Sequence, residues 1–176
     1  SHDAGIAFIA TPFDLSSAEL TAEICDVIKI SSGDNTFYPL IDKVATAGKP
    51  TALSTGMLDV KRLQRPFGIL VEALGEDNLA LLHCVTSYPV EPKDANVAAV
   101  RTLMKGFGCE IGYSDHTLGA EACLAAVACG ARIIEKHFTL DHNYSDFRDH
   151  QLSANPVEMT DLVKRVRVLE TLLGSG

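Results

Sequence analysis

The chain has 176 residues, of which 47% are hydrophobic and 22% are charged, as in an ordinary globular protein with its own core. Its net charge is −8 and it has no basic stripe, which argues against nucleic acid as a partner. No apolar run reaches the roughly 20 residues that cross a bilayer, and no signal peptide is recognisable at the start, so we expect no membrane partner. The five cysteines form no C-x-x-C pair, which favours a reducing, cytoplasmic location.

Short apolar runs alternate along the chain with longer stretches, and the runs begin 21 to 31 residues apart. Runs such as IAFIA and LALL are almost continuously apolar, which is typical of parallel strands buried on both faces. This regular alternation of apolar runs with longer stretches indicates repeated βα units. We predict six strands, at Ile6–Pro12, Val27–Ser32, Pro50–Gly56, Leu79–Ser87, Glu110–Ser114 and Ala131–Thr139.

Helices are predicted between these strands and after the last one. The final helix has the clearest start, because Asn155 can cap it, Pro156 suits its first turn and Glu158 is favoured near its N-terminus. An apolar stripe at helical spacing predicts that it packs on a sheet. The stripe consists of Leu162, Val163, Val166, Leu169, Leu172 and Leu173. The other predicted helices are Ser16–Ile24, Tyr38–Ala47, Val60–Leu74, Asp94–Gly106 and Ala120–Cys129.

The chain has no linker and no low-complexity tract, so we predict a single domain over residues 1–176. Its one long irregular stretch is Asp141–Ala154, and loops of that length are often functional. Six βα units do not close an eight-stranded barrel, which usually takes about 250 residues. The pattern therefore leaves two architectures open, a doubly wound sheet and a barrel that lacks two units.

Each of the six predicted strands ends in polar side chains. Ligands of parallel α/β folds bind at the carboxyl ends of strands, although a single serine or threonine there can equally cap the next helix. Polar residues at six successive strand ends favour a ligand pocket that these side chains line. The residues are Thr11; Ser32 and Asp34; Ser54 and Thr55; Thr86 and Ser87; Ser114, Asp115 and His116; and His137 and Thr139.

Lys29 interrupts the apolar run VIKISS, and a lysine inside a buried strand is rare unless it is paired. We interpret it as a ligand of phosphate or carboxylate, or as a Schiff-base nucleophile. A lysine that extends to solvent from an edge strand is the alternative.

Two of the six histidines, His116 and His137, lie at the ends of neighbouring predicted strands. Two imidazoles there could share a divalent metal and leave positions open for substrate and water. Spacing alone, however, favours two hydrogen-bonded barrel histidines. His83, in the run LLHC, is predicted to be a hydrogen-bonded core histidine.

Eight motifs occur in the order IATPFD, KISSGD, YPLI, GKPTALSTGM, LLHCVTSYP, IGYSDHT, EKHFTLD and DHQLSANP. In this order they resemble the sialic acid synthase family, whose members make N-acetylneuraminate, legionaminate or pseudaminate from phosphoenolpyruvate. The similarity runs from about Gly5 to Pro156. The resemblance implies an α/β fold, a (β/α)₈ TIM-type barrel, of which this chain holds strands three to eight. On this resemblance we expect the first two strands and the family's antifreeze-like C-terminal domain to be absent from it.

The resemblance also implies a role for particular residues. His116 and His137 match the family's metal ligands, usually for Mn²⁺, and together with Asp34 and Lys29 they form the implied catalytic set. The residues that match the phosphoenolpyruvate site are Thr11, Lys29, Ser32, Ser54 and Ser114. Those that match positions facing an acylmannosamine-type acceptor are Asp34, Thr86, Tyr88 and Asp149.

The implied activity is that of a cytoplasmic transferase of the N-acetylneuraminate synthase type, acting as a homo-oligomer on phosphoenolpyruvate and an acylated amino sugar. Two departures from the family pattern fall on positions that face the acceptor. Asp34 stands where the family usually has glutamate, and the late loop reads YSDFRDHQLS instead of a Gly-Pro-Asp or Gly-Ser-Asp run.

Two other functions remain open at this point. One is a Schiff-base aldolase built on Lys29. The other is a catalytically incomplete fragment that acts only in an oligomer, in which a partner covers the open edge of the barrel.

Overall fold

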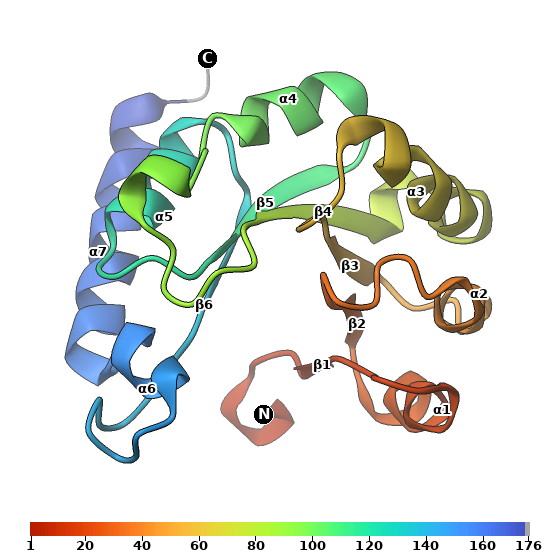
Figure 1. The fold of residues 1–176 in the computed structure, drawn as a ribbon, viewed down its shortest axis with the longest axis horizontal. Coiled ribbons are helices and arrows are strands. Elements are labelled where there is room, and N and C mark those ends of the chain that lie inside the picture. The colour runs from red at the N-terminus through yellow and green to blue at the C-terminus, as the bar shows by residue number, and fades with distance from the viewer. Residues whose placement is uncertain (175–176) are drawn as a thin grey trace. The chain divides into compact units, whose positions relative to one another are not determined.

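The computed structural model describes residues 1–174, and the contacts between Cα atoms divide the chain into two compact units. Unit 1 comprises Ser1–Leu82 and Gly106–Glu110. Unit 2 comprises His83–Lys105 and the chain from Ile111 onward. The elements of both units are labelled in Figure 1.

Unit 1 is a parallel sheet with one helix after each of its first three strands (Figure 1). Strand β1 pairs with β2, β2 with β3, and β3 with β4, so that the strands follow one another in chain order. The strands are β1 (Ile9–Ala10), β2 (Val27–Ile30), β3 (Thr51–Ser54) and β4 (Leu79–Cys84), of which β4 continues into unit 2. The helices are α1 (Leu15–Ile24), α2 (Tyr38–Thr46) and α3 (Val60–Leu74).

Unit 2 holds the second half of the elements, with β5 and β6 paired in parallel. In their register Ser114 lies opposite Glu135, and Asp115 lies opposite Lys136. The elements are α4 (Ala99–Gly106), β5 (Glu110–Asp115), α5 (Glu121–Ala128), β6 (Ile133–Lys136), α6 (Arg148–Leu152) and α7 (Pro156–Leu173), although the last residue of α4 and the first of β5 belong to unit 1. Short 3-10 helices occupy His2–Ala4, Glu76–Asn78 and Pro92–Asp94.

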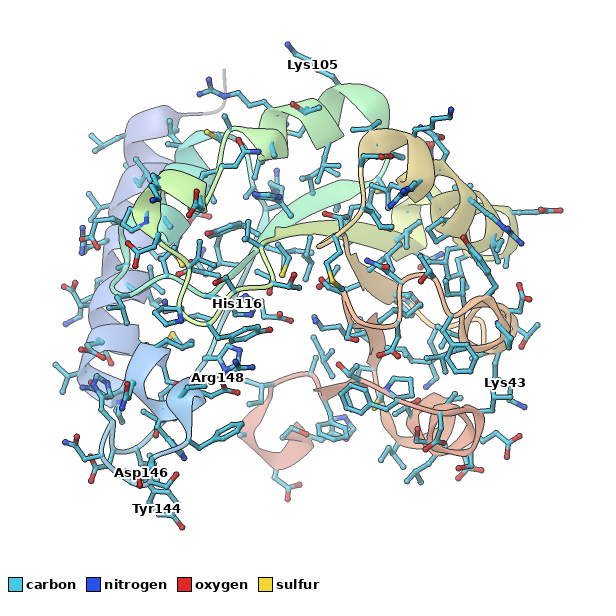
Figure 2. All side chains as sticks on the ribbon, in the orientation of Figure 1. Lys43, Lys105, His116, Tyr144, Asp146 and Arg148 are labelled. Carbon is cyan, nitrogen blue, oxygen red and sulfur yellow. The ribbon has the colours of Figure 1, made fainter. Side chains whose placement is uncertain are left out.

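The core of unit 1 forms because β3 and β4 are buried along their whole length, as their continuous apolar runs predict. Leu53 and Leu81 lie opposite each other in this pair, and both are fully buried. Charged side chains remain outside: Lys43 on α2 donates a hydrogen bond of 2.7 Å to the exposed Glu19 on α1 (Figure 2). None of the helices in residues 1–174 has the length and apolar character needed to cross a membrane.

The six strands overlap the ranges that the sequence predicts, but the first and the last are much shorter. Of the predicted Ile6–Pro12, only Ile9 and Ala10 are strand, and Ile9 is 52% exposed. Strand β2 alternates between half-buried and buried residues, so Lys29 is half-exposed and not enclosed. The prediction that the run IAFIA is a strand buried on both faces is wrong, because Ile6 and Ile9 are 62% and 52% exposed.

Three predictions in the second half of the chain need correction. Helix α4 begins at Ala99 and not at Asp94, because Asn96 has a positive φ of 44° that an α-helix cannot accommodate. The stretch Asp141–Ala154 is not wholly irregular, since it contains α6. The apolar stripe of α7 is buried only in part: Leu162 is 4% exposed, whereas Leu172 is 78% exposed.

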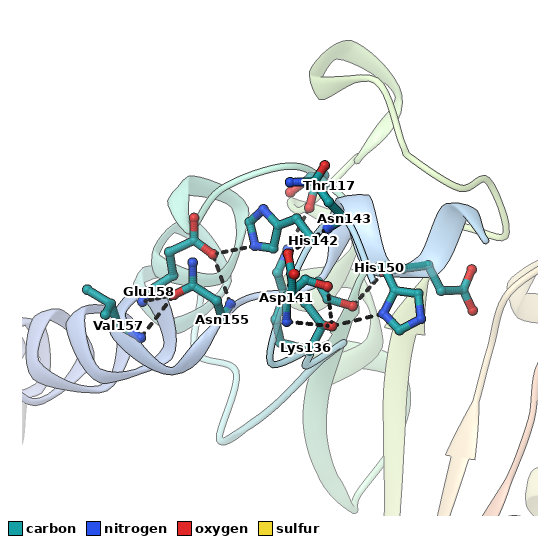
Figure 3. Close-up of polar contacts among 12 residues, drawn as sticks. Thr117, Lys136, Asp141, His142, Asn143, His150, Asn155, Val157 and Glu158 are labelled. Carbon is teal, nitrogen blue, oxygen red and sulfur yellow. Dashed lines mark hydrogen bonds and ion pairs between the residues drawn. The ribbon is translucent and has the colours of Figure 1, made fainter. Parts of the chain in front are cut away.

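The start of α7 confirms the predicted cap (Figure 3). Asn155 Oδ1 accepts hydrogen bonds from the backbone N–H groups of Val157 and Glu158, at 2.9 and 3.0 Å. Glu158 Oε2 accepts from the backbone N–H of Asn155 at 2.9 Å, which completes a capping box. His142, in the loop after β6, lies 3.1 Å from the same carboxylate oxygen and ties the loop to the helix.

Asn155→Ala should therefore destabilise the protein by about 1 kcal/mol, because two backbone donors at the start of α7 lose their acceptor. Urea unfolding followed by circular dichroism measures this change. Lys164→Ala, at an exposed position in the middle of the same helix, is the matched control and should change stability by less than about 0.5 kcal/mol. Equal stability of the Asn155 variant and the control would contradict the role of the cap.

Candidate active site

Three rings from unit 2 meet at the carboxyl ends of its strands. His116 follows the last residue of β5, and His137 follows the last residue of β6. The centroids of the two imidazoles are 5.1 Å apart. Tyr88, from the segment after β4, stacks on His116 at 4.1 Å and meets His137 edge-on at 5.8 Å. The structure thus brings together three of the residues that the sequence predicts for the site.

The hydrogen bonds of His116 leave one ring nitrogen available as a ligand. Its ring is buried, and Nδ1 lies 2.9 Å from the carbonyl oxygen of Val85. A carbonyl can only accept, so Nδ1 carries the proton and Nε2 keeps its lone pair in the neutral ring. The thiol of Cys84 lies 3.9 Å from Nδ1, on the same side as this carbonyl bond.

A carboxylate from α6 lies near His137. Its Nδ1 lies 3.9 Å from Oδ2 of Asp149. The other carboxylate oxygen, Oδ1, is buried, makes no hydrogen bond within residues 1–174, and lies 3.7 Å from Nε of Arg148. A carboxylate beside a metal-binding imidazole typically fixes the ring and raises its basicity. In this structure Asp149 lies at an ion-pair distance from His137, beyond the length of a hydrogen bond.

This arrangement fits a divalent ion held by two imidazoles. Within the part of the chain that the structure describes, no cluster of three or more His, Cys, Asp or Glu side chains is suitable for a metal ion. The histidine pair would therefore supply two ligands and leave the remaining positions to substrate and water, as a reactive site requires.

Tyr88 is held between two charged groups and His116. Partial burial is the main cause that raises the pKa of its phenol, and the carboxylate of Asp149 raises this pKa further. The phenol therefore stays protonated at neutral pH and can donate a hydrogen bond. The guanidinium of Arg148 lies 4.9 Å from the centroid of the Tyr88 ring, within the range of a cation–π interaction.

A buried ion pair joins the two strands of unit 2 beneath these rings. Lys136 Nζ lies 2.7 Å from Oδ2 of Asp115, and the two side chains are 3% and 0% exposed. Lys136 also donates to the carbonyl of Thr117, and Asp115 accepts from Tyr113 Oη, the Thr117 N–H and Cys123 Sγ. Every charge in this network is paired, which a buried ion requires.

Ser114, predicted to bind phosphoenolpyruvate, donates a hydrogen bond of 2.6 Å to Glu135 in the neighbouring strand. Sequence reasoning did not identify Glu135, Cys84, Arg148 or Lys136 as residues near the site. Lys136 and Glu135 belong to the EKH motif itself, and Arg148 lies in the loop that departs from the family pattern. Thr86, predicted to face the acceptor, is exposed.

In unit 1 the predicted phosphoenolpyruvate residues lie at the ends of β2 and β3. Ser32 Oγ accepts a hydrogen bond of 3.1 Å from the backbone N–H of Gly56. Asn35 donates to the carbonyl oxygens of Ser54 and Gly56, at 3.2 and 2.8 Å, and so fastens these two strand ends together. Ser54 Oγ is buried and has no hydrogen-bond partner within residues 1–174, so a hydroxyl is available at this place.

The other predicted residues of unit 1 are accessible to a ligand. Asp34 accepts a hydrogen bond of 2.6 Å from Ser31 Oγ. Thr11, Lys29 and Asp34 are all half-exposed. Each of these residues is thus placed at or beyond a strand end, as the sequence predicts, except Lys29, which lies within β2.

His83 and the cysteines have structural positions. His83 is buried, lies 3.0 Å from the carbonyl oxygen of Ala95 and stacks on Tyr113, and burial lowers its pKa, so the prediction of a core histidine is confirmed. All five cysteines are free. Burial raises the pKa of the Cys109 thiol to about 11, and it also raises the pKa of Cys123, so neither is a nucleophile at neutral pH.

Comparison with known proteins identifies relatives along the entire chain. The sequence model of the NeuB family matches residues 1–176. An N,N'-diacetyllegionaminic acid synthase of Campylobacter jejuni is 41% identical over 97% of this chain and 52% of its own length. The human N-acetylneuraminate-9-phosphate synthase is 35% identical over 99% of this chain and 48% of its own length. The chain therefore spans about half the length of these curated relatives.

Solved structures confirm the predicted fold class. The N-acetylneuraminic acid synthetase of Leptospira borgpetersenii matches 100% of this chain and 61% of its own, with 37% identity and a TM-score of 0.94. A truncated 3-deoxy-D-arabino-heptulosonate 7-phosphate synthase from Thermotoga maritima shares the fold alone, with 17% identity and a TM-score of 0.85. The fold is thus that of a TIM-type barrel with six of its βα units present, and not a doubly wound sheet.

Proposed function

The chain belongs to the NeuB family, and on that premise we propose that it carries the active site of a phosphoenolpyruvate-dependent sugar-acid synthase. The enzyme would condense phosphoenolpyruvate with an N-acylmannosamine-type aldehyde and release phosphate, giving a product of the sialic acid type. The observation that carries this proposal is the pair of imidazoles, His116 and His137, with Tyr88 and Asp149 against them.

Phosphoenolpyruvate would be held by hydroxyls and one ammonium. Ser32, Ser54 and Lys29 offer donors in unit 1, and charge-assisted hydrogen bonds to phosphate and carboxylate oxygens are the strong ones. Ser54 Oγ, which has no partner among the described residues, suits this role because its burial is otherwise costly. Ser114 is a further residue that the family resemblance assigns to phosphoenolpyruvate, and its hydroxyl donates a hydrogen bond to Glu135.

The acceptor would lie against the residues of unit 2. His116 and His137 would hold a divalent ion, which would supply a Lewis acid for the acceptor aldehyde. Tyr88 would donate a hydrogen bond from its protonated phenol, and Asp149 would accept one from a sugar hydroxyl while it orients His137. Asp34 would hydrogen-bond sugar hydroxyls or assist proton transfer.

The proposed reaction begins with the formation of a carbon–carbon bond. The methylene carbon of phosphoenolpyruvate forms a bond to the aldehyde carbon of the acceptor, and the aldehyde oxygen takes up the electron pair and a proton. Water adds to the carbon that bears the phosphate ester, because that carbon becomes cationic. The C–O bond to the phosphate then breaks and inorganic phosphate leaves. Free thiols in the chain agree with a cytoplasmic enzyme.

A phosphate-release assay tests the proposal. The full-length protein, given phosphoenolpyruvate, Mn²⁺ and a panel of acylated mannosamine-type sugars, should release phosphate only when both substrates are present. Release from phosphoenolpyruvate alone, or none with any sugar, would contradict it. Borohydride trapping with pyruvate separates the aldolase alternative, which requires a covalent adduct at Lys29, whereas the synthase forms none.

A further inference from the structure

The buried ion pair of unit 2 directly precedes both histidines of the candidate site. Asp115 ends β5 and Lys136 ends β6, and the two lie opposite each other in the register of these strands. The next residues along the chain are His116 and His137. The carboxylate of Asp115 is directed towards α5, where Cys123 Sγ lies 3.3 Å from it. Both charged side chains are almost fully buried, so neither can contact a substrate.

One ammonium group holds the backbone on both sides of His116. Lys136 Nζ lies 2.7 Å from Asp115 Oδ2, and it also donates a hydrogen bond to the carbonyl oxygen of Thr117. Asp115 Oδ1 accepts a hydrogen bond of 2.9 Å from the backbone N–H of Thr117. The residues before and after His116 are therefore both fastened to the side chain that precedes His137. The two backbone segments that carry the imidazoles can separate only if these buried contacts break.

Stability alone does not account for an ion pair at this place. The side chains of Lys136 and Asp115 are 3% and 0% exposed, and removing two charges from water is costly. Apolar side chains of similar volume often stabilise a fold as well or better. An ion pair adds direction, because charge-assisted hydrogen bonds are strong and require a narrow range of distances and angles. Such a pair suits a place where the relative position of two strand ends has to be fixed.

A divalent ion shared by two imidazoles has this requirement. The ring centroids of His116 and His137 are 5.1 Å apart, and each ring comes from a different strand. The affinity of the pair for one ion therefore depends on how firmly the two strand ends are held together.

We propose that the ion pair of Asp115 and Lys136 holds His116 and His137 in place for a shared divalent ion. Asp115 and Lys136 are then positioning residues, which set the affinity for the ion without touching it. This inference rests on the proposed function and adds to it two residues that control the metal site.

The test measures the Kd for Mn²⁺ by electron paramagnetic resonance in the full-length protein and in the double variant Asp115→Asn, Lys136→Met. The double variant removes both charges together, so that no buried charge is left unpaired. Its Kd should rise about tenfold. This value is at the lower end of the roughly 10- to 100-fold effect of outer-shell partners, because the pair acts on the backbone and not on the imidazoles themselves.

A control variant separates positioning from a general loss of stability. Leu103→Ala removes a buried side chain, 5% exposed, from α4 in the same unit and destabilises the protein by leaving a cavity. Urea unfolding should show a loss of stability in this variant, but its Kd for Mn²⁺ should stay within about twofold of the wild-type value. A second double variant, Asp115→Asn with Lys136→Gln, keeps a donor and an acceptor without the charges, and its Kd should lie between those of the wild-type protein and the first double variant.

Other outcomes would overturn the inference. A wild-type Kd in the first double variant would overturn it and leave the proposed function intact. An equal rise of the Kd in Leu103→Ala would show that any loss of stability loosens the site. If the first double variant does not fold, the second decides: a raised Kd supports the inference and an unchanged one overturns it. Absence of Mn²⁺ binding in the wild-type protein would overturn the proposed metal site and this inference with it.

Discussion

His116→Ala is expected to lower synthase activity of the full-length protein about a thousandfold or more and to abolish tight Mn²⁺ binding. The variant removes Nε2, the nitrogen left free by the bond between Nδ1 and the carbonyl of Val85. A single imidazole binds a divalent ion weakly. Loss of the bound Lewis acid removes several kcal/mol of transition-state stabilisation, and each 1.4 kcal/mol or so corresponds to a tenfold change in rate. Activity is measured by phosphate release, and metal binding by titration of Mn²⁺ with electron paramagnetic resonance.

The control for this prediction is His142→Gln. His142 also belongs to unit 2, but its ring contacts Glu158 at the start of α7 and no residue of the proposed site. It should bind Mn²⁺ and turn over as the wild-type protein does. Unchanged turnover and unchanged Mn²⁺ affinity in His116→Ala would show that the histidine pair holds no metal.

Lys136→Met should destabilise the protein by about 3–5 kcal/mol, because it leaves Asp115 charged and unpaired in a fully buried position. Urea unfolding measures the loss of stability. Where the variant is too unstable for this, the yield of folded protein is measured instead. Lys43→Met, which breaks the exposed pair with Glu19, is the control and should cost less than about 1 kcal/mol. The double variant Asp115→Asn, Lys136→Met should recover part of the loss.

The pH dependence of this variant has a definite direction. Burial alone would raise the pKa of Asp115, but hydrogen bonds from Lys136 and the Thr117 N–H outweigh it, and the pKa lies below its usual value. In the wild-type protein this group therefore contributes stability above its unfolded pKa of about 3.9, and the contribution is lost as the pH falls through the lower folded pKa.

In Lys136→Met only burial and the weaker hydrogen bonds remain, so the pKa of Asp115 should rise above the unfolded value. The folded state then binds the extra proton, and the variant should become more stable as the pH falls from 7 towards that raised pKa. If the stability of Lys136→Met changed with pH as that of the wild-type protein does, the assignment of the ion pair would be contradicted.

Much of the fold could be predicted because its elements are long and patterned. Helix α3 begins and ends at the predicted residues, Val60 and Leu74, and the cap of α7 at Asn155 follows from its side-chain chemistry. Helix α6 was missed because five residues are too few for a helical period to show. The start of α4 was predicted too early because Asn96 has a positive φ, and the residue type alone does not predict this backbone conformation.

The candidate site could be predicted only as a set of strand ends. The order of the predicted strands places His116 and His137 at neighbouring strand ends, but the distance between their rings follows only from the structure. The partners of these residues depend on register and on loop paths. The pairing of Lys136 with Asp115 needs the register of β5 and β6, and the contact of Arg148 with Tyr88 needs the position of α6. Both therefore became visible only in the structure.

The most direct test of a two-histidine metal site serving the condensation is reconstitution of the metal-stripped protein. Phosphate release from phosphoenolpyruvate and the preferred acceptor is measured while Mn²⁺ is added to full-length protein that has been treated with a chelator. Activity should be absent at the start, rise with added Mn²⁺ and level off at one ion per chain. Full activity in the stripped protein, with no response to Mn²⁺, would contradict the account.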